Sequence, residues 1–251
     1  MIFSILSDPI LLLFMIPTLF IALPVHEYFH AYTATKLGDP TPRSLGRLSL
    51  NPMRHLDPIG AVSLLLLGFG WAKPVPVDSR YFAHPRRGMA LVAASGPLSN
   101  LVMSLIGGFL YLGCYRISYI IAAGTGIVLA AKFFYYLSYF FYVFHFVNLT
   151  LCIFNLIPLS PLDGSHLLSL LLPAKANYWI ARHQKQLYLG LMAWLLLGSF
   201  AYRFLLRIPL IGGNPILRNL VRILSLSGLI SDLTSWISQG ILKLFSFIPF
   251  L

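Results

Sequence analysis

The most distinctive chemical pattern in this sequence is His26-Glu27-Tyr28-Phe29-His30, which has the form H-E-x-x-H. Residues four apart lie on one face of an α-helix, so both imidazoles can bind one zinc ion. The intervening carboxylate then lies beside the zinc-bound water, where it can act as a general base. A shuffled chain of this composition contains the pattern in about 7 of 10,000 cases. The pattern therefore predicts a catalytic zinc site with His26 and His30 as ligands and Glu27 as the catalytic residue.

Glu27 is the single glutamate of the chain, and it lies within a long apolar stretch. A carboxylate inside a membrane span costs about 2.5–3.5 kcal/mol on insertion scales, so such a residue is functional by default. The alternative is a glutamate near a helix end that reaches the membrane interface. In that case the two histidines would be hydrogen-bonded packing residues.

A catalytic zinc ion normally takes three protein ligands and leaves a fourth position for water. Asp163 differs from the other aspartates because it follows a spanning stretch, in Asn155-Leu-Ile-Pro-Leu-Ser-Pro-Leu-Asp163-Gly164. The two prolines break the helix there and free backbone groups that need partners or water. We therefore predict Asp163 as the third zinc ligand. The alternative is that Asp163 only caps a short helix over 165–172.

The other histidines receive less specific interpretations. His166 is close enough in sequence to Asp163 to reach the metal, but a capping or packing role is favoured. His145 lies in an apolar stretch and is expected to be buried and hydrogen-bonded. The remaining three lie in polar loops and are expected to be solvated: His55, His84 and His183.

The composition of the chain is that of an integral membrane protein. Of the 251 residues, 58% are hydrophobic and only 10% are charged, and the mean hydropathy is +0.80. Soluble domains contain about 45–50% apolar and about 25% charged residues. The net charge of +11 comes from 18 Lys and Arg against 7 Asp and Glu. In so apolar a chain the basic residues are expected to flank bilayer spans, and nucleic-acid binding is disfavoured.

The apolar stretches predict an all-α polytopic membrane protein with about four to six transmembrane helices. Residues 1–251 are expected to form a single membrane-embedded metalloprotease domain, with a catalytic core over 9–172 and a C-terminal helix and amphipathic tail over 186–251. The part 208–251 should lie on the membrane or pack against the bundle. The segment 117–131 is left open between an interfacial piece and an additional span. The expected spans are 9–35, 89–115, 133–157 and 186–206.

The segment over about 45–77 is predicted to be re-entrant or β-hairpin-like. Its apolar run, 59–72, has 14 residues, which is shorter than the roughly 17–25 of a spanning helix. A crossing there would separate two groups of four cations, whereas a re-entrant segment keeps all eight on one side. By the positive-inside rule that side is cytoplasmic. Val62, Val75 and Val77 suit extended structure, so an edge in 59–77 could pair with an unwound substrate strand.

The sequence resembles the site-two proteases, a family of intramembrane zinc metalloproteases, in a short form without PDZ or CBS domains. The resemblance rests on five motifs in order: the H-E-x-x-H pattern with Gly38-Asp39; Gly46-Arg47-Leu48 with Asn51-Pro52; Trp71 to Val77; Gly96-Pro97-Leu98-Ser99-Asn100; and Asn155 to Gly164. It implies that His26, His30 and Asp163 bind zinc and that Glu27 is catalytic. It also implies that Asn100 and Asn155 shape the site or bind substrate.

These observations predict an intramembrane endopeptidase with one Zn²⁺ per chain that cleaves peptide bonds in or near transmembrane segments of membrane proteins. The resemblance places it in a bacterial cytoplasmic membrane, and the charge distribution predicts a site that opens toward the cytoplasm. The first alternative is a transporter or a proton or cation relay that uses the His/Glu cluster. The second is a catalytically inactive scaffold with a structural zinc ion.

Overall fold

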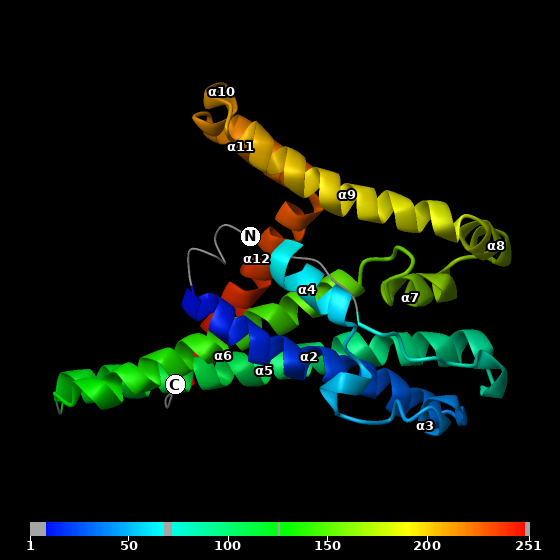
Figure 1. Ribbon diagram of the computed structural model, residues 1–251, viewed down its shortest axis with the longest axis horizontal. Helices are drawn as coiled ribbons and strands as arrows, with labels where there is room; N and C mark the ends of the chain where they lie inside the picture. Colours follow the sequence, from blue (N-terminus) through cyan, green and yellow to red (C-terminus); the bar gives the residue numbers. More distant parts are fainter. Residues whose placement is uncertain (1–8, 68–71, 125, 249–251) are drawn as a thin grey trace.

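The computed structural model describes residues 9–67, 72–124 and 126–248, and the regular elements within these ranges are helical (Figure 1). This confirms the predicted all-α class. In chain order the elements are α2 (Pro9–Lys36), α3 (Thr41–Ser44), η1 (Pro52–Arg54), α4 (Pro58–Leu67), η2 (Ser79–Tyr81), α5 (Pro85–Gly124), α6 (Val128–Asn155), α7 (Gly164–Leu171), α8 (Ala174–Arg182), α9 (Gln184–Leu205), α10 (Pro209–Gly212), α11 (Pro215–Leu224) and α12 (Leu226–Ser246).

Three helices in the described ranges, α2, α5 and α6, are long and apolar enough to cross a membrane. At 1.5 Å per residue the 28 residues of α2 extend about 42 Å, which exceeds the roughly 30 Å hydrocarbon core. The pair α11 and α12, bent by 101°, would be a fourth span if it crosses as one unit. The lower limit of the predicted four to six spans is reached if this pair is counted as one span. The residues of the expected span over 186–206 form helix α9, but α9 is not one of the three helices that are long and apolar enough to cross a membrane.

Helices α5 and α6 form a long antiparallel hairpin, which lies beside α2 (Figure 1). Gly107 allows this close approach, because a Cβ there would lie 2.9 Å from Phe144 and 3.0 Å from the His145 nitrogen. His145 is fully buried and hydrogen-bonded, as predicted. The described residues of the segment 117–131, which its sequence left open, include the end of α5 and the start of α6.

The segment 45–77 is closed at its base but contains no β-hairpin within its described residues. Leu56 and Ala72 form one isolated antiparallel bridge, and the chain between them begins as helix α4. Val62 lies in this helix, so the prediction that it is extended was wrong. The prediction that His55 is solvated was also wrong. Its side chain is fully buried, with one ring nitrogen 2.6 Å from the Ser49 carbonyl oxygen.

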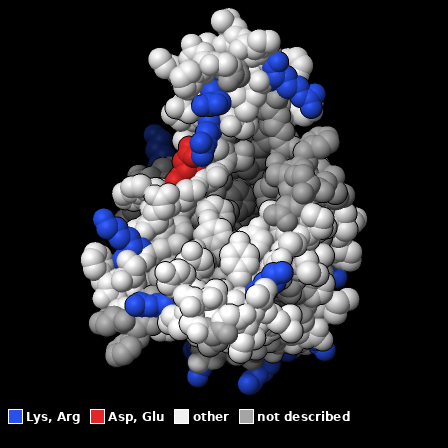
Figure 2. All heavy atoms as spheres, turned by 90° about the vertical axis from the view of Figure 1, so that its left-hand side faces the viewer, with Lys and Arg blue, Asp and Glu red and all other residues white. Residues whose placement is uncertain are grey.

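The C-terminal elements form a second, looser layer. Helices α9 and α11 pack against each other and project from the three long helices, while α12 returns and crosses α5 and α6 (Figure 1). A buried cluster joins this layer to the core, made of Leu162, Leu191, Leu195, Leu226 and Ile230. The face at the far end of the α5–α6 hairpin carries scattered Lys and Arg side chains among uncharged residues and is hollowed between the two layers (Figure 2). The prediction that the tail packs against the bundle is met by α12.

Candidate metal centre

Helix α2 places His26 and His30 one turn apart on the face that meets α5. Both side chains are buried, and their Nε2 atoms lie 3.0 Å apart. The two rings meet edge to face, with centroids 4.6 Å apart. Gly96 of α5 provides the room, because a Cβ there would lie 2.5 Å from His30 and 2.7 Å from His26.

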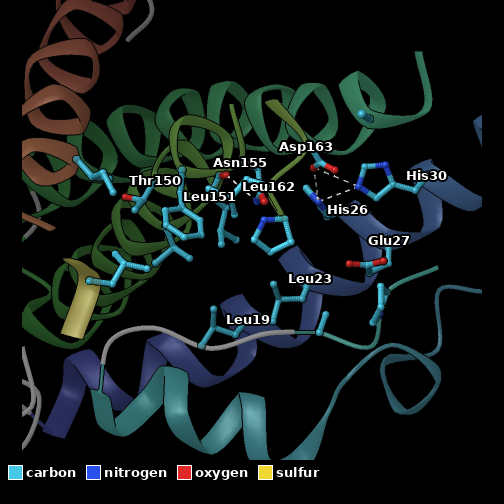
Figure 3. Close-up of a pocket in the computed structure, with 18 of the residues that line it drawn as sticks. Leu19, Leu23, His26, Glu27, His30, Thr150, Leu151, Asn155, Leu162 and Asp163 are labelled. Atoms are coloured by element: carbon cyan, nitrogen blue, oxygen red, sulfur yellow. Dashed lines mark hydrogen bonds and ion pairs between the residues drawn. The ribbon is translucent and has the colours of Figure 1, made fainter. Parts of the chain in front are cut away.

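The loop between α6 and α7 brings Asp163 to the same point (Figure 3). Its Oδ2 lies 3.2 Å from the Nε2 of His26 and 3.3 Å from the Nε2 of His30. Gly164 permits this placement, because a Cβ there would meet the Leu156 carbonyl oxygen at 2.3 Å. Asp163 occupies the N-cap position of α7, but its side chain makes no capping hydrogen bond. The capping alternative therefore does not account for this carboxylate.

Each imidazole is oriented through its other ring nitrogen. The Nδ1 of His26 lies 2.6 Å from the Oδ1 of Asn100, and the Nδ1 of His30 lies 2.7 Å from the Val92 carbonyl oxygen. The Asn100 amide is itself fixed, since its Nδ2 donates to the Oδ1 of Asn148 at 2.9 Å. Both acceptors are oxygens, so the proton of each neutral imidazole is on Nδ1 and the lone pair is on Nε2.

Three electron-pair donors therefore face one another: two Nε2 atoms and the Oδ2 of Asp163. The three ligand atoms lie within 4.8 Å of one another, and the buried Oδ2 of Asp163 has no hydrogen-bond partner. A single proton can bridge only two of these atoms, whereas a metal cation at their centre satisfies all three. Two imidazoles and one carboxylate form a donor set typical of catalytic zinc, with a fourth position left open.

The donor set lines one end of a cavity of about 1060 Å³. Glu27 lines this cavity too, is half-buried, and points into it (Figure 3). Apolar side chains of α2 and α6 form a large part of the remaining wall, among them Leu19, Leu23 and Leu151. The metal-binding face is therefore reached from an apolar chamber between the helices.

The two predicted asparagines lie in different environments. Asn155 lines the cavity and donates its Nδ2 to the Leu151 carbonyl oxygen at 3.0 Å. Asn100 is fully buried and does not line the cavity. Its location suits orientation of His26 rather than contact with a substrate. A substrate-binding role stays an untested prediction for both residues.

Two contributors to the site were not identified from the sequence, Val92 and Asn148, whereas Gly96 is the first residue of the motif that ends at Asn100. The Val92 contact uses a backbone oxygen, which has no residue-type signal. Asn148 did offer one, since an amide within an apolar span is expected to have a specific partner. His166 lines the cavity but does not belong to the cluster of possible metal ligands in the described residues.

Comparison with known proteins agrees with this geometry. The profile of peptidase family M50 matches residues 14–199. A protein of Bacillus subtilis strain 168 named "Putative zinc metalloprotease YwhC" is 42% identical over 162 residues, which cover 64% of this chain and 69% of that protein. "Putative zinc metalloprotease Rip2" of Mycolicibacterium smegmatis is 27% identical over 57% of this chain and 51% of its own length.

Rip2 of Mycobacterium tuberculosis strain H37Rv is similar to the same extent, with 28% identity over 155 residues. The match again covers about half of the relative, 51% of its length. No solved structure matches the chain. The family profile covers most of the sequence, including all four residues that the structure brings together at the candidate metal centre, and the chain therefore belongs to peptidase family M50, the site-two family of zinc metalloproteases.

Proposed function

We propose that this protein is an intramembrane zinc-dependent endopeptidase that cleaves peptide bonds in or near the transmembrane segments of membrane proteins. The observation that carries the proposal is the position of the donor set. His26, His30 and Asp163 lie at one end of an apolar cavity, between helices long enough to cross a bilayer. A hydrolytic site for soluble peptides would have no need of such surroundings.

His26, His30 and Asp163 would hold one zinc ion. When bound, zinc polarises the scissile carbonyl and makes water a better nucleophile at neutral pH. Glu27 accepts the proton of the attacking water and then delivers it to the leaving amine. Its position in the helical turn between the two histidines, and its place in the lining of the same cavity, support this role. Asn100 and the Val92 carbonyl keep the histidine lone pairs directed at the metal.

The cavity supports an apolar peptide as substrate. A transmembrane helix resists hydrolysis because each peptide group is bonded internally, so part of it must unwind before cleavage. The extended chain over 73–77 lines the cavity through Pro74, Val75 and Val77. Its backbone edge offers hydrogen-bond groups to an unwound substrate strand. Val62 has no part in this edge because it lies in α4.

The location follows from the charge pattern. Lys36 ends helix α2 six residues after His30, and Arg86 and Arg87 begin α5. These cations lie at the metal-binding ends of their helices, so the positive-inside rule places the centre toward the cytoplasm. The relatives named above are bacterial proteins, which supports a bacterial cytoplasmic membrane.

The test uses the purified chain in liposomes with a single-pass membrane substrate, with and without a zinc chelator. We expect cleavage that the chelator abolishes and added zinc restores. Glu27→Gln should keep the zinc and lose hydrolysis, whereas Asp163→Asn should lose zinc as well. An ion relay predicts instead that Glu27→Gln abolishes proton or cation flux in a chain that never cleaves. Zinc bound by a wild type without hydrolysis would indicate the scaffold and contradict the proposal.

A further inference from the structure

Arg47 holds together two stretches of chain that are far apart in the sequence. Its guanidinium donates to the carbonyl oxygen of Arg54, and its Nη2 donates to those of Lys73 and Pro74, each at 2.6 Å. Arg54 in turn donates to the Gly46 carbonyl oxygen at 3.1 Å. One planar cation thus satisfies three backbone acceptors at the base of the segment closed by the Leu56–Ala72 bridge.

Asp39 holds the other end of the same extended chain. Its carboxylate is fully buried and accepts two backbone hydrogen bonds, from Thr41 at 2.9 Å and from Asp78 at 2.8 Å. The chain from Lys73 to Asp78 is therefore fixed at its first residues by Arg47 and at its last by Asp39. We call residues 73–77 the cavity wall.

Between these anchors the cavity wall has few contacts of its own. The Lys73 amide donates to the His55 carbonyl oxygen at 2.7 Å, and the Val77 side chain packs against the buried cluster of Ala34, Phe82 and Val92. No hydrogen bond involves the backbone amides of Val75 or Val77 among the described residues. An extended chain without a paired neighbour is held in place only where its ends are fixed. The backbone of the middle of the wall, which lines the same cavity as Glu27, is therefore held mainly through its ends, where Arg47 binds two of its carbonyl oxygens.

We propose that Arg47 is a positioning residue that fixes the cavity wall and thereby determines which peptide bond of a membrane substrate is cut. The inference rests on the proposed function, since it assumes that the substrate lies between the wall and the metal centre. A guanidinium is required because its rigid fork reaches several carbonyl oxygens at once, whereas an ammonium group is a single flexible point charge. Arg47→Lys should therefore keep the charge and lose the fixed wall.

The first measurement is amide hydrogen exchange of Arg47→Lys in lipid, without substrate. Within 72–78, exchange should accelerate at the Lys73 amide, which donates to the His55 carbonyl oxygen at 2.7 Å. Exchange should stay unchanged over α2 and α5, and the zinc content should equal that of the wild type. Arg43→Lys is the matched control. Arg43 is an exposed arginine four residues earlier, and none of the hydrogen bonds to the wall involves it.

The second measurement is the distribution of cut sites in a single-pass substrate, read by mass spectrometry. We expect Arg47→Lys to cut at additional neighbouring bonds and to lose about tenfold in kcat/KM, chiefly through KM, because the wall no longer aligns the substrate. Arg43→Lys should cut at the wild-type position. Asp39→Asn, which weakens the other anchor, should broaden the same distribution.

Wild-type cut sites and KM in a zinc-loaded Arg47→Lys protein would overturn the inference and leave the proposed function intact. Unchanged exchange over 72–78 would overturn it as well. If Arg47→Lys fails to bind zinc or to fold, Asp39→Asn decides by the same two measurements. A wild type that cleaves no membrane substrate would refute the proposed function instead, and the exchange measurement would still test the anchoring.

Discussion

Replacement of Asn100 separates two roles that its position could have, orientation of a zinc ligand and contact with a substrate. In Asn100→Leu a side chain of similar size removes the acceptor of the His26 Nδ1 proton and the donor to Asn148. The proton then has no partner at a fully buried position. His26 can rotate, or move its proton to Nε2, and either change removes its lone pair from the metal.

The expected loss is a weakening of zinc binding by about 10- to 100-fold, the range seen when the hydrogen-bond partner of a metal-bound histidine is removed. This corresponds to about 1.4–2.8 kcal/mol, and it agrees with the roughly 1–3 kcal/mol cost of one buried unsatisfied polar group. Asn100→Asp keeps an acceptor for the His26 proton. Its zinc affinity should therefore stay closer to that of the wild type than the affinity of Asn100→Leu.

The assay is competition for zinc between the purified protein and a chromophoric chelator at fixed pH, followed by kinetics on zinc-saturated samples. Ser104→Ala is the matched control. Ser104 lies one turn further along α5, is also fully buried, and is hydrogen-bonded to His145 rather than to a metal ligand. If Asn100→Leu binds zinc like the wild type but raises KM, the orientation argument is refuted and Asn100 contacts substrate.

Two further substitutions test the packing around the site. Gly96→Ala should abolish zinc binding and hydrolysis, because the new Cβ would lie 2.5 Å from His30. Gly124→Ala is the control and should leave both unchanged, because a Cβ there meets none of the described residues within 4 Å. The zinc content of the two purified variants measures the loss of zinc binding. His145→Leu should lower the free energy of unfolding by about 2–4 kcal/mol, because it leaves the hydroxyls of Ser104 and Ser238 unpaired. Denaturant titration in detergent checks this value, and an unchanged midpoint would show that the network does not hold α12.

The clustering of His26, His30 and Asp163 could be predicted from sequence because its strongest signals are local or compositional. His26 and His30 share a helix face by spacing alone, and Glu27 is a costly charge in an apolar stretch. Asp163 could be selected because so few acidic residues compete with it. Each inference required only the period of a helix and the cost of a buried charge.

The surroundings of the centre could not be obtained in this way. The acceptor for His30 is a backbone oxygen of Val92, which any residue type would supply if the helices packed equally closely. The close approach depends on Gly96, whose significance is visible only once α5 lies against α2. Sequence spacing gives the face of a helix but not the distance between two helices.

The segment 45–77 contains one weighting error, the expectation that Val62 is extended. Its valines favoured an extended interpretation, but Asp57-Pro58 is a helix start signal, and the Oδ1 of Asp57 accepts the Gly60 amide proton at 2.9 Å. The local start signal outweighed the β preference of Val62. His55 was misjudged because its neighbours are polar, although the folded loop encloses it.

Gly96 and Asn100 lie one turn apart on α5, and the hydrogen bond between Asn100 and His26 depends on the glycine. Without a side chain at position 96, α5 can approach the two imidazoles of α2. At that separation the Asn100 amide reaches the His26 Nδ1 at 2.6 Å. A larger residue at 96 would push α5 away and lengthen this hydrogen bond even if Asn100 were kept. The two substitutions should therefore not be additive, because once Gly96→Ala has displaced the helix, Asn100→Leu has little orientation left to remove.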